Sequence, residues 1–270
     1  MPFFVAADGT QIYFEEAGTG TPVIALPGLT RNTTDFDHVA PHLDCRLIRL
    51  DYRGRGQSDW AAPETYTVPV EASDVLALMD HLSLPKAAFL GTSRGGMIAM
   101  FLAATAKDRV LGIALNDIGP EIAKTGLSVI RAYVGQRPTQ KTYAEAAALR
   151  ATLPGFANVP MDRWLAEVRQ QYVQTDDGLE LRYDPALAGT LGDGSEPAPN
   201  LWLLFDAMVG LPLVMIRGAN SDLLTTETFA EMQRRRPDAI VASVPDRAHI
   251  PFLDEDVSLE ALHRWLGAMT

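Results

Sequence analysis

Short apolar runs alternate with longer segments of helical periodicity at both ends of the chain, and this alternation limits its fold more than any other feature. The runs are almost wholly apolar, which is typical of strands that helices cover on both faces. In Val68–Leu82, by contrast, apolar side chains recur every three to four residues, as in an amphipathic helix. Strands that alternate with such helices indicate βαβ units and a parallel sheet. The predicted strands are Gln11–Glu16, Pro22–Leu26, Arg46–Leu50, Ala87–Leu90, Val110–Leu115, Leu213–Arg217 and Ala239–Val244.

The middle of the chain, from Gly119 to Asn200, interrupts this rhythm. It contains helical patterns at Lys141–Ala151 and Met161–Gln174 but no convincing buried strand, and it closes in a turn-rich linker over 192–200. Because the strand pattern resumes afterwards, we interpret 119–200 as a helical insertion rather than an independent domain. The sheet domain is then predicted to comprise residues 1–118 and 201–270. Its other predicted helices are Thr33–His42, Met97–Ala106, Thr225–Arg235 and Val257–Leu266.

Composition and charge exclude several classes of function. With 23 Lys and Arg against 34 Asp and Glu, the net charge is −11, so the chain should repel phosphate backbones, and we expect no nucleic-acid partner. Cys45 is the single cysteine, which excludes an intrachain disulfide and a thiolate metal cluster. No H-E-x-x-H pattern or comparable ligand cluster indicates a catalytic metal. The first residues include no basic region, and no run approaches the ~18 apolar residues of a membrane span, so we expect a cytoplasmic protein without membrane association.

The sharpest local signal is Gly91-Thr92-Ser93-Arg94-Gly95-Gly96, which fits G-x-S-x-G between a predicted strand and a predicted helix. A serine on so tight a turn has a strained backbone, and glycines two positions to either side avoid collisions with the neighbouring elements. The turn lifts the hydroxyl clear of the sheet, and the following helix aims its positive end at the reaction centre. A glycine-rich connection with an inert serine would give the same motif, but the flanking strand and helix favour Ser93 as a nucleophile.

A serine nucleophile needs a base, and His249 is the candidate. It lies in a loop directly after the final predicted strand, where parallel α/β sheets build their sites. The other four histidines lie in or beside predicted helices, where a surface role is the simpler interpretation.

The acid that orients the base should lie on a comparable loop, and two aspartates qualify. Asp222 follows the penultimate predicted strand, and Asp117 follows the strand Val110–Leu115. We favour Asp222, because Asp117 precedes Ile118-Gly119-Pro120, where an aspartate is readily explained as a turn residue that bonds to its own backbone. Asp222→Asn is therefore expected to cost on the order of 10⁴ in turnover, and Asp117→Asn much less.

Taken together, these motifs resemble the α/β-hydrolase superfamily over nearly the full length of the chain. The resemblance implies a mostly parallel, doubly wound sheet of about eight strands with a helical lid inserted at 119–200. It also implies a serine hydrolase that needs no cofactor. The segments that carry the resemblance, in the order of the family, are Ala25–Leu29, Asp51–Ser58, Gly91–Gly96, Arg217–Asp222 and Ala248–Leu253.

The resemblance further implies an oxyanion hole made by the backbone N–H groups of Leu29 and Arg94. Pro27-Gly28 stands where many members have His-Gly, which changes the polarity of the entrance but leaves the backbone donors. Arg247-Ala248 is bulkier than the commoner glycine before the histidine. Related folds that open epoxides or remove halides have an aspartate at the position of Ser93, so those reactions are disfavoured.

The predicted function is hydrolysis of a small carboxylic ester or lactone through an acyl-enzyme on Ser93, with His249 as base and Asp222 as acid. C–C bond hydrolysis, acyl transfer, and a non-catalytic receptor of the same fold are the alternatives. Substrate choice is expected to lie mainly in the lid. Trp164 and Trp202 are candidate pocket residues, with packing of the lid itself as the competing explanation. Arg131 and Arg163 are candidates for binding a carboxylate, but a position on the solvated surface is the simpler explanation for both.

Overall fold

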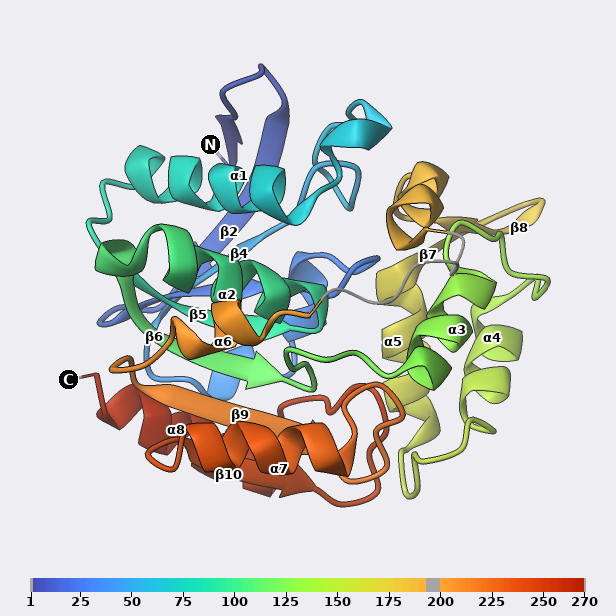
Figure 1. The fold of residues 1–270 in the computed structure, drawn as a ribbon. Coiled ribbons are helices and arrows are strands. Elements are labelled where there is room, and N and C mark those ends of the chain that lie inside the picture. The colour runs from blue at the N-terminus through green and yellow to red at the C-terminus, as the bar shows by residue number, and fades with distance from the viewer. Residues whose placement is uncertain (1, 193–199, 270) are drawn as a thin grey trace.

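The computed structural model describes residues 2–192 and 200–269, and its centre is a twisted sheet flanked by helices (Figure 1). Within the described residues the sheet has eight strands in the order β1-β2-β4-β3-β5-β6-β9-β10. The first two strands run antiparallel to their neighbours, and the other six are parallel. This architecture confirms the predicted fold class. The strands are β1 (Phe3–Val5), β2 (Gln11–Ala17), β3 (Pro22–Leu26), β4 (Arg46–Leu50), β5 (Ala87–Thr92), β6 (Val110–Asn116), β9 (Leu213–Gly218) and β10 (Ile240–Val244).

Helices cover both faces of the sheet, which explains why the strands are apolar throughout. In β3, Ile24 belongs to the core under α1, α2, α6 and α7, whereas its neighbours Val23 and Ala25 belong to the core under α8. This is the period-two alternation of a strand buried on both sides. None of the helices in the described part of the chain is long and apolar enough to cross a membrane. The helices are α1 (Val68–His81), α2 (Arg94–Thr105), α6 (Trp202–Asp206), α7 (Thr226–Arg235) and α8 (Asp256–Gly267).

The predicted helix over Thr33–His42 is wrong in detail. Two short 3-10 helices take its place, η1 (Thr33–Phe36) and η2 (Ala40–His42). Pro41 accounts for the difference, because proline lacks an amide hydrogen and disfavours the helical conformation of the residue before it.

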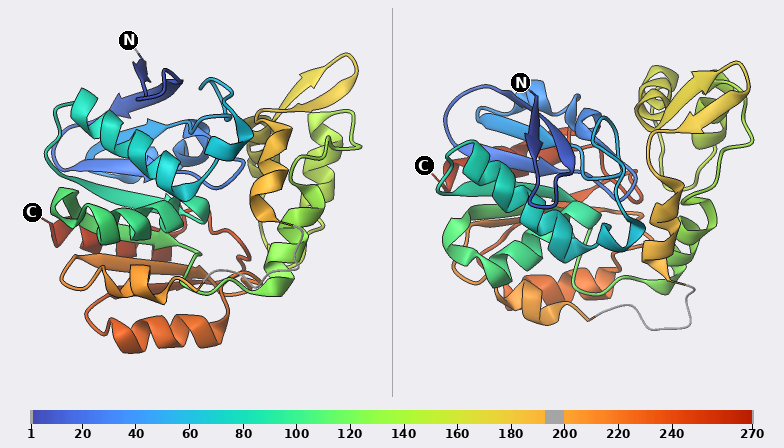
Figure 2. Two further views of the ribbon diagram at one scale, coloured as in Figure 1. Left: turned by 45° about the horizontal axis from the view of Figure 1, so that its top comes forward. Right: turned by 90° about the horizontal axis from the view of Figure 1, so that it is seen from above.

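Residues 124–191, which follow β6 in the chain and precede α6, stand beside the sheet and join none of its strands (Figures 1 and 2). We call this segment the insertion. It has a small apolar core of its own, centred on Trp164, Val168 and Leu179. The predicted linker over 192–200 lies mostly outside the described residues. The elements of the insertion are α3 (Lys124–Tyr133), α4 (Tyr143–Arg150), α5 (Met161–Gln171), β7 (Tyr172–Thr175), β8 (Gly178–Leu181) and η5 (Pro185–Leu191).

The helix predicted over Met161–Gln174 extends too far, because its last residues belong to the hairpin β7–β8. Tyr172–Thr175 pairs antiparallel with Gly178–Leu181 around the turn at Asp176 and Asp177. The Asp-Gly step at Asp177-Gly178 is a turn signal that the helical pattern obscured.

Polar contacts hold the insertion against loops at the carboxyl ends of two strands. Arg31, after β3, pairs with Glu167 of α5 at 2.8 Å, and the Asn32 side chain donates to the Gln170 carbonyl at 2.8 Å. After β9, the Asn220 side chain donates to the Gly155 carbonyl at 3.1 Å. The insertion therefore lies across the edge of the sheet at which the parallel strands end.

The only cysteine provides a test of the packing at the far end of the sheet. Cys45 is 3% exposed, and burial raises the pKa of its thiol to about 11. Since the thiolate is the reactive form and exists only as the pH approaches that value, we expect 5,5′-dithiobis(2-nitrobenzoate) not to label the native protein at pH ~8. Labelling of one thiol should appear after denaturation in guanidinium chloride. Rapid labelling of the native protein would contradict this packing.

Candidate active site

Ser93 lies on the turn between β5 and α2 with an unusual backbone conformation. Its φ of 50° and ψ of −111° place it outside the regions that L-residues prefer, which costs roughly 1–3 kcal/mol. Two glycines make the turn possible. A Cβ atom at Gly95 would collide with the carbonyl oxygen of Leu26 in β3, and one at Gly91 would collide with the amide of Gly96. The close approach of α2 to β3 and β5 therefore requires glycine at both positions, as the sequence motif predicts.

His249 follows β10 and faces Ser93. Its Nε2 atom lies 3.2 Å from the Ser93 hydroxyl oxygen, and its Nδ1 atom lies 2.8 Å from the Asp117 Oδ2 atom. The Asp117 carboxylate is fully buried, whereas the imidazole is 15% exposed. A hydroxyl, an imidazole and a buried carboxylate are thus joined in series, the arrangement that lets an imidazole take a proton from a serine.

The structure does not bring Asp222, the predicted acid, to the histidine and places Asp117 there instead. The Asp222 side chain is exposed, and its main-chain carbonyl accepts a hydrogen bond from the Thr125 hydroxyl of α3 at 3.3 Å. The difference lies in where each aspartate stands relative to its strand. Asp117 directly follows β6 and its side chain is fully buried, whereas Asp222 lies beyond Gly218, the last residue of β9, at an exposed position of its loop.

The loop that contains Asp222 supports the Asp117 carboxylate. The Gly218 amide donates to Asp117 Oδ1 at 2.8 Å, and the Ser221 hydroxyl donates to Oδ2 at 2.6 Å. These contacts also refute the interpretation of Asp117 as a turn residue that bonds to its own backbone. Sequence reasoning missed Ser221 and Gly218, because their role depends on which strand lies next to β9.

The candidate oxyanion donors are the amide of Arg94, which follows Ser93 in the chain, and the amide of Leu29. Arg94 is the first residue of α2, so its amide has no partner within the helix. Leu29 lies on the loop after β3, which α2 approaches at Gly95. Neither amide makes a hydrogen bond to another group in the described part of the chain. Both are therefore free to donate to an incoming anion.

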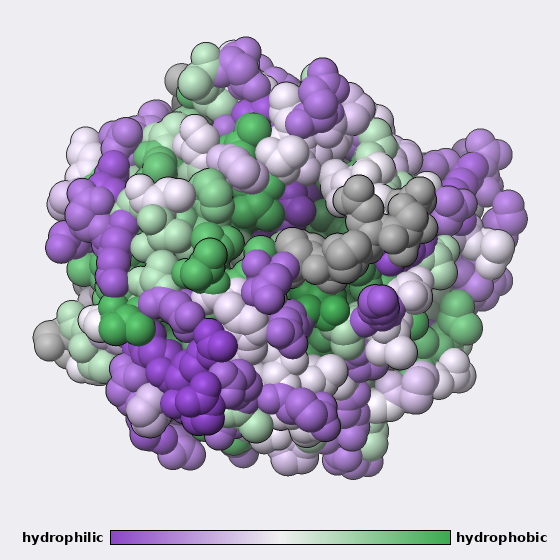
Figure 3. Space-filling view, in the orientation of Figure 1, coloured by the Kyte–Doolittle hydropathy of each residue, from purple (hydrophilic) through white to green (hydrophobic). Residues whose placement is uncertain are grey.

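The two predicted pocket tryptophans lie elsewhere. Trp164 is 3% exposed and packs edge-on against Phe156 at 5.4 Å and Phe252 at 5.9 Å, so it belongs to the core of the insertion. Trp202 donates to Glu121 at 2.6 Å and lies under the Arg235 guanidinium at 4.0 Å. It lines a hollow together with residues of α7, and neither Ser93 nor His249 belongs to that lining. The surface over α7 is largely hydrophilic (Figure 3).

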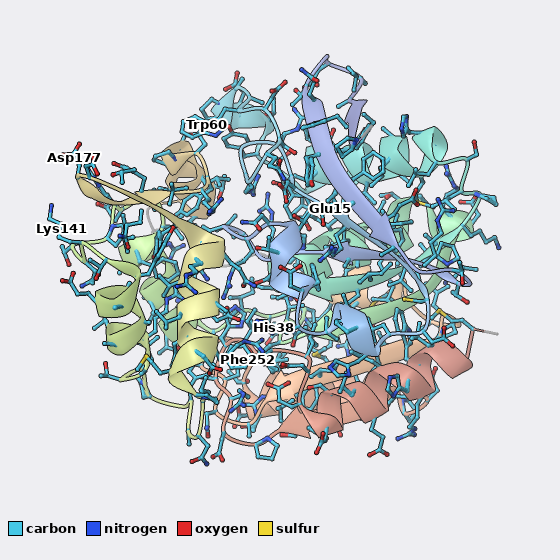
Figure 4. All side chains as sticks on the ribbon, turned by 180° about the vertical axis from the view of Figure 1, so that it is seen from behind. Glu15, His38, Trp60, Lys141, Asp177 and Phe252 are labelled. Atoms are coloured by element: carbon cyan, nitrogen blue, oxygen red, sulfur yellow. The ribbon has the colours of Figure 1, made fainter. Side chains whose placement is uncertain are left out.

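The two arginines considered for a carboxylate are already occupied. Arg131 donates twice to the Leu191 carbonyl, at 3.0 and 2.8 Å. Arg163 pairs with Asp254 at 2.6 Å, and its guanidinium lies 4.2 Å from the ring of Phe252, which sits beside α5 (Figure 4). The charge of Arg163 is balanced by Asp254 and Glu167, whereas Arg131 is held by a neutral carbonyl and has no ion-pair partner among the described residues.

Comparison with known proteins agrees with the geometry. A family model for the alpha/beta hydrolase fold matches residues 21–256. The chain is 39% identical to a 3-hydroxybutyrate-oligomer hydrolase from Cupriavidus necator, covering 86% of this chain and 84% of the relative. It is 28% identical to a 2-(acetamidomethylene)succinate hydrolase from Mesorhizobium japonicum, covering 94% and 90%. The crystal structure of an alpha/beta hydrolase from Novosphingobium aromaticivorans superimposes with a TM-score of 0.90 at 35% identity, over 98% of this chain and 96% of the other. The chain therefore belongs to the α/β-hydrolase family.

Proposed function

We propose that this protein is a serine hydrolase that cleaves ester bonds in small hydroxyacid esters. The observation that carries the proposal is the series from the Ser93 hydroxyl through His249 to Asp117, with hydrogen-bond distances of 3.2 and 2.8 Å. A receptor that only binds a ligand needs no such series, so the arrangement favours catalysis.

In this mechanism His249 Nε2 accepts the Ser93 proton as the serine oxygen attacks the acyl carbon. Asp117 holds the proton on Nδ1 and stabilises the imidazolium that forms. The amides of Leu29 and Arg94 donate to the oxyanion of the tetrahedral intermediate, and each contributes ~3 kcal/mol. His249 then gives its proton to the leaving alcohol. Water attacks the acyl-enzyme by the same route and releases the acid; a lactone would react in the same way, with its alcohol still tethered.

The substrate class rests on a second observation, the free charge of Arg150 at the end of α4. Its guanidinium donates to the Gln171 side chain and lies 5.9 Å from the Tyr172 ring, and it has no ion-pair partner among the described residues. Tyr133 is 47% exposed, yet burial raises the pKa of its hydroxyl, while the charges of Arg31 and Arg150 act in the opposite direction. Arg31 and Arg150 are thus close enough to Tyr133 for their charges to act on its hydroxyl.

An arginine without an ion-pair partner among the described residues suits a substrate that carries a carboxylate. Arg31 is already neutralised by Asp35 at 2.9 Å and Glu167 at 2.8 Å, so Arg150 is the cation left to pair with a ligand. The relative from Cupriavidus necator is named for oligomers of 3-hydroxybutyrate, which join hydroxyacid units by ester bonds and end in a carboxylate. We propose that the substrate of this protein combines the same two groups.

Replacing the nucleophile tests the reaction. Ser93→Ala should abolish hydrolysis of short p-nitrophenyl esters and labelling by a fluorophosphonate probe, without lowering the unfolding temperature, because the hydroxyl is needed for the covalent step. Ser128→Ala, at an exposed serine of α3, is the matched control and should keep both activities. A Ser93→Ala variant that retained most of the parent turnover would refute the mechanism.

Replacing the two candidate acids tests the geometry. Asp117→Asn should lower turnover on the order of 10⁴-fold, because an amide favours the wrong imidazole tautomer. Asp222→Asn should leave turnover nearly unchanged, since the Asp222 side chain is exposed and its contact to Thr125 uses the main chain. Kinetics of both variants on one p-nitrophenyl ester decide the matter. The opposite ranking would show that Asp222 orients the histidine.

Replacing Arg150 tests the substrate class. Arg150→Met should lower kcat/KM for the linear dimer of 3-hydroxybutyrate roughly 10- to 100-fold, the effect of losing a charge-assisted hydrogen bond. The methyl ester of the same dimer, which has no charge, should be hydrolysed as before. Arg169→Met is the control, because Arg169 also lies over a tyrosine ring, that of Tyr143, but is exposed. Equal losses on the acid and its methyl ester would exclude a carboxylate contact at Arg150.

A further inference from the structure

A buried carboxylate that the mechanism does not use lies beneath the two oxyanion donors. Glu71 of α1 is completely buried, and its carboxylate lies between two arginines. Its Oε1 atom is 2.8 Å from Arg55 Nη1, and its Oε2 atom is 2.8 Å from Arg94 Nε. The side chain of Arg55 is 0% exposed and that of Arg94 is 12% exposed, so three charges are held almost without water.

Arg55 connects this carboxylate to the loop that carries Leu29. Its Nε atom donates to the Leu29 carbonyl at 2.9 Å, and its guanidinium lies between the rings of Tyr52 and Tyr66, at 5.4 and 5.5 Å. The Tyr52 hydroxyl in turn donates to the Pro27 carbonyl at 3.3 Å. The carbonyls of Pro27 and Leu29, on either side of Gly28, therefore accept hydrogen bonds from Tyr52 and Arg55, whose side chains contact each other.

The carbonyl of Gly28 itself is also engaged, because it accepts a hydrogen bond from the Arg31 amide at 3.1 Å. The N–H of a trans peptide points away from the C=O of the same peptide plane. Fixing the Gly28 carbonyl therefore fixes the direction of the Leu29 N–H, and Arg55 fixes the position of the loop that holds this peptide.

Arg94 connects the same carboxylate to the other donor. Its Nε atom is bound to Glu71, and its Nη2 atom donates to the Tyr66 carbonyl at 3.0 Å. The Ser93 carbonyl accepts from the Gly96 amide at 2.9 Å, which orients the peptide that bears the Arg94 N–H. One carboxylate thus joins the loop after β3 to the first turn of α2.

Stability alone is a poor explanation for this set of charges. Among the described residues Arg55 Nη2 has no hydrogen-bond partner, and the contact between Arg55 and Glu71 Oε1 lacks hydrogen-bond geometry. Buried ion pairs must offset the cost of desolvation, and well-packed apolar side chains often stabilise a fold as much or more. What the charges supply is a fixed distance between two backbone segments.

We infer that Glu71 is a positioning residue for the oxyanion hole, acting through Arg55 and Arg94 on the spacing of the Leu29 and Arg94 amides. The inference rests on the proposed function, in which these amides hold the oxyanion. The interactions of an oxyanion hole are realised mainly in the transition state, so a change in its spacing affects kcat more than KM.

The test compares Glu71 with a matched acid on the same helix. Asp74 lies one turn further along α1, is 4% exposed, and pairs with Arg53 at 2.8 Å. Arg53 also donates to Asp8 through Nη1 and Nη2, and within the described residues its side chain makes no hydrogen bond to the loop of Leu29. Glu71→Gln and Asp74→Asn therefore each remove one buried charge from α1, but only the first acts on the proposed donors.

For Glu71→Gln we expect kcat on p-nitrophenyl butyrate to fall about 10- to 100-fold with little change in KM. This loss is smaller than the ~10²–10³-fold loss of kcat that follows removal of a whole oxyanion donor. Affinity for a boronic acid, which mimics the tetrahedral intermediate, should fall in proportion, and the pH profile of kcat/KM should keep its shape. Asp74→Asn should lower the unfolding temperature but keep kcat. If Glu71→Gln does not fold, Arg94→Gln breaks only the α2 half of the link and should lower kcat about 10-fold, still without changing KM.

Three results would overturn the inference: a folded Glu71→Gln variant with the parent kcat, an equal loss of kcat in Asp74→Asn, or an effect confined to KM. With Arg94→Gln as the substitute, retention of the parent kcat would overturn it. Measurements on the unsubstituted protein distinguish a failure of the proposed function from a failure of the inference about Glu71. If it neither hydrolyses the ester nor reacts with a fluorophosphonate, the proposed function and the inference both fail; if it does both, only the inference is at stake.

Discussion

The close contact between α2 and the end of β3 is the constraint on which the candidate site depends. At Gly95 the backbone of the helix lies against the Leu26 carbonyl, with no room for a side chain. This contact places the first turn of α2 beside the loop that continues from β3. It therefore fixes the strained serine and brings both unpaired amides to the same edge of the sheet. Every other residue of the candidate site is oriented toward that edge.

Sequence reasoning found this arrangement where the signal was local. The glycines of the turn, the serine between them and the histidine after the last strand each follow from steric or chain-order arguments about neighbouring residues. The identity of the acid does not follow from such local arguments, because Asp117 and Asp222 both follow strands and both precede the histidine. The choice between them depends on which loop turns its carboxylate toward His249, and this follows from contacts between loops that are far apart in the sequence.

The distinction between local and long-range signals also explains the other differences between the predictions and the structure. Pro41 broke a predicted helix, and Asp177-Gly178 began a hairpin inside another, so both errors had local signals that a broader helical pattern outweighed. Trp164 was different, since nothing in its surrounding sequence tells a pocket side chain from one that packs against Phe156 and Phe252. Aromatic side chains suit both roles, and only the packed structure separates them.

Arg31 belongs to two parts of the molecule at once. Its amide closes the turn at Gly28, and its guanidinium binds Glu167 on the insertion. A movement of α5 away from the sheet would pull on the turn that aims the Leu29 N–H. The position of the insertion and the direction of this amide are therefore coupled through one side chain and its own backbone.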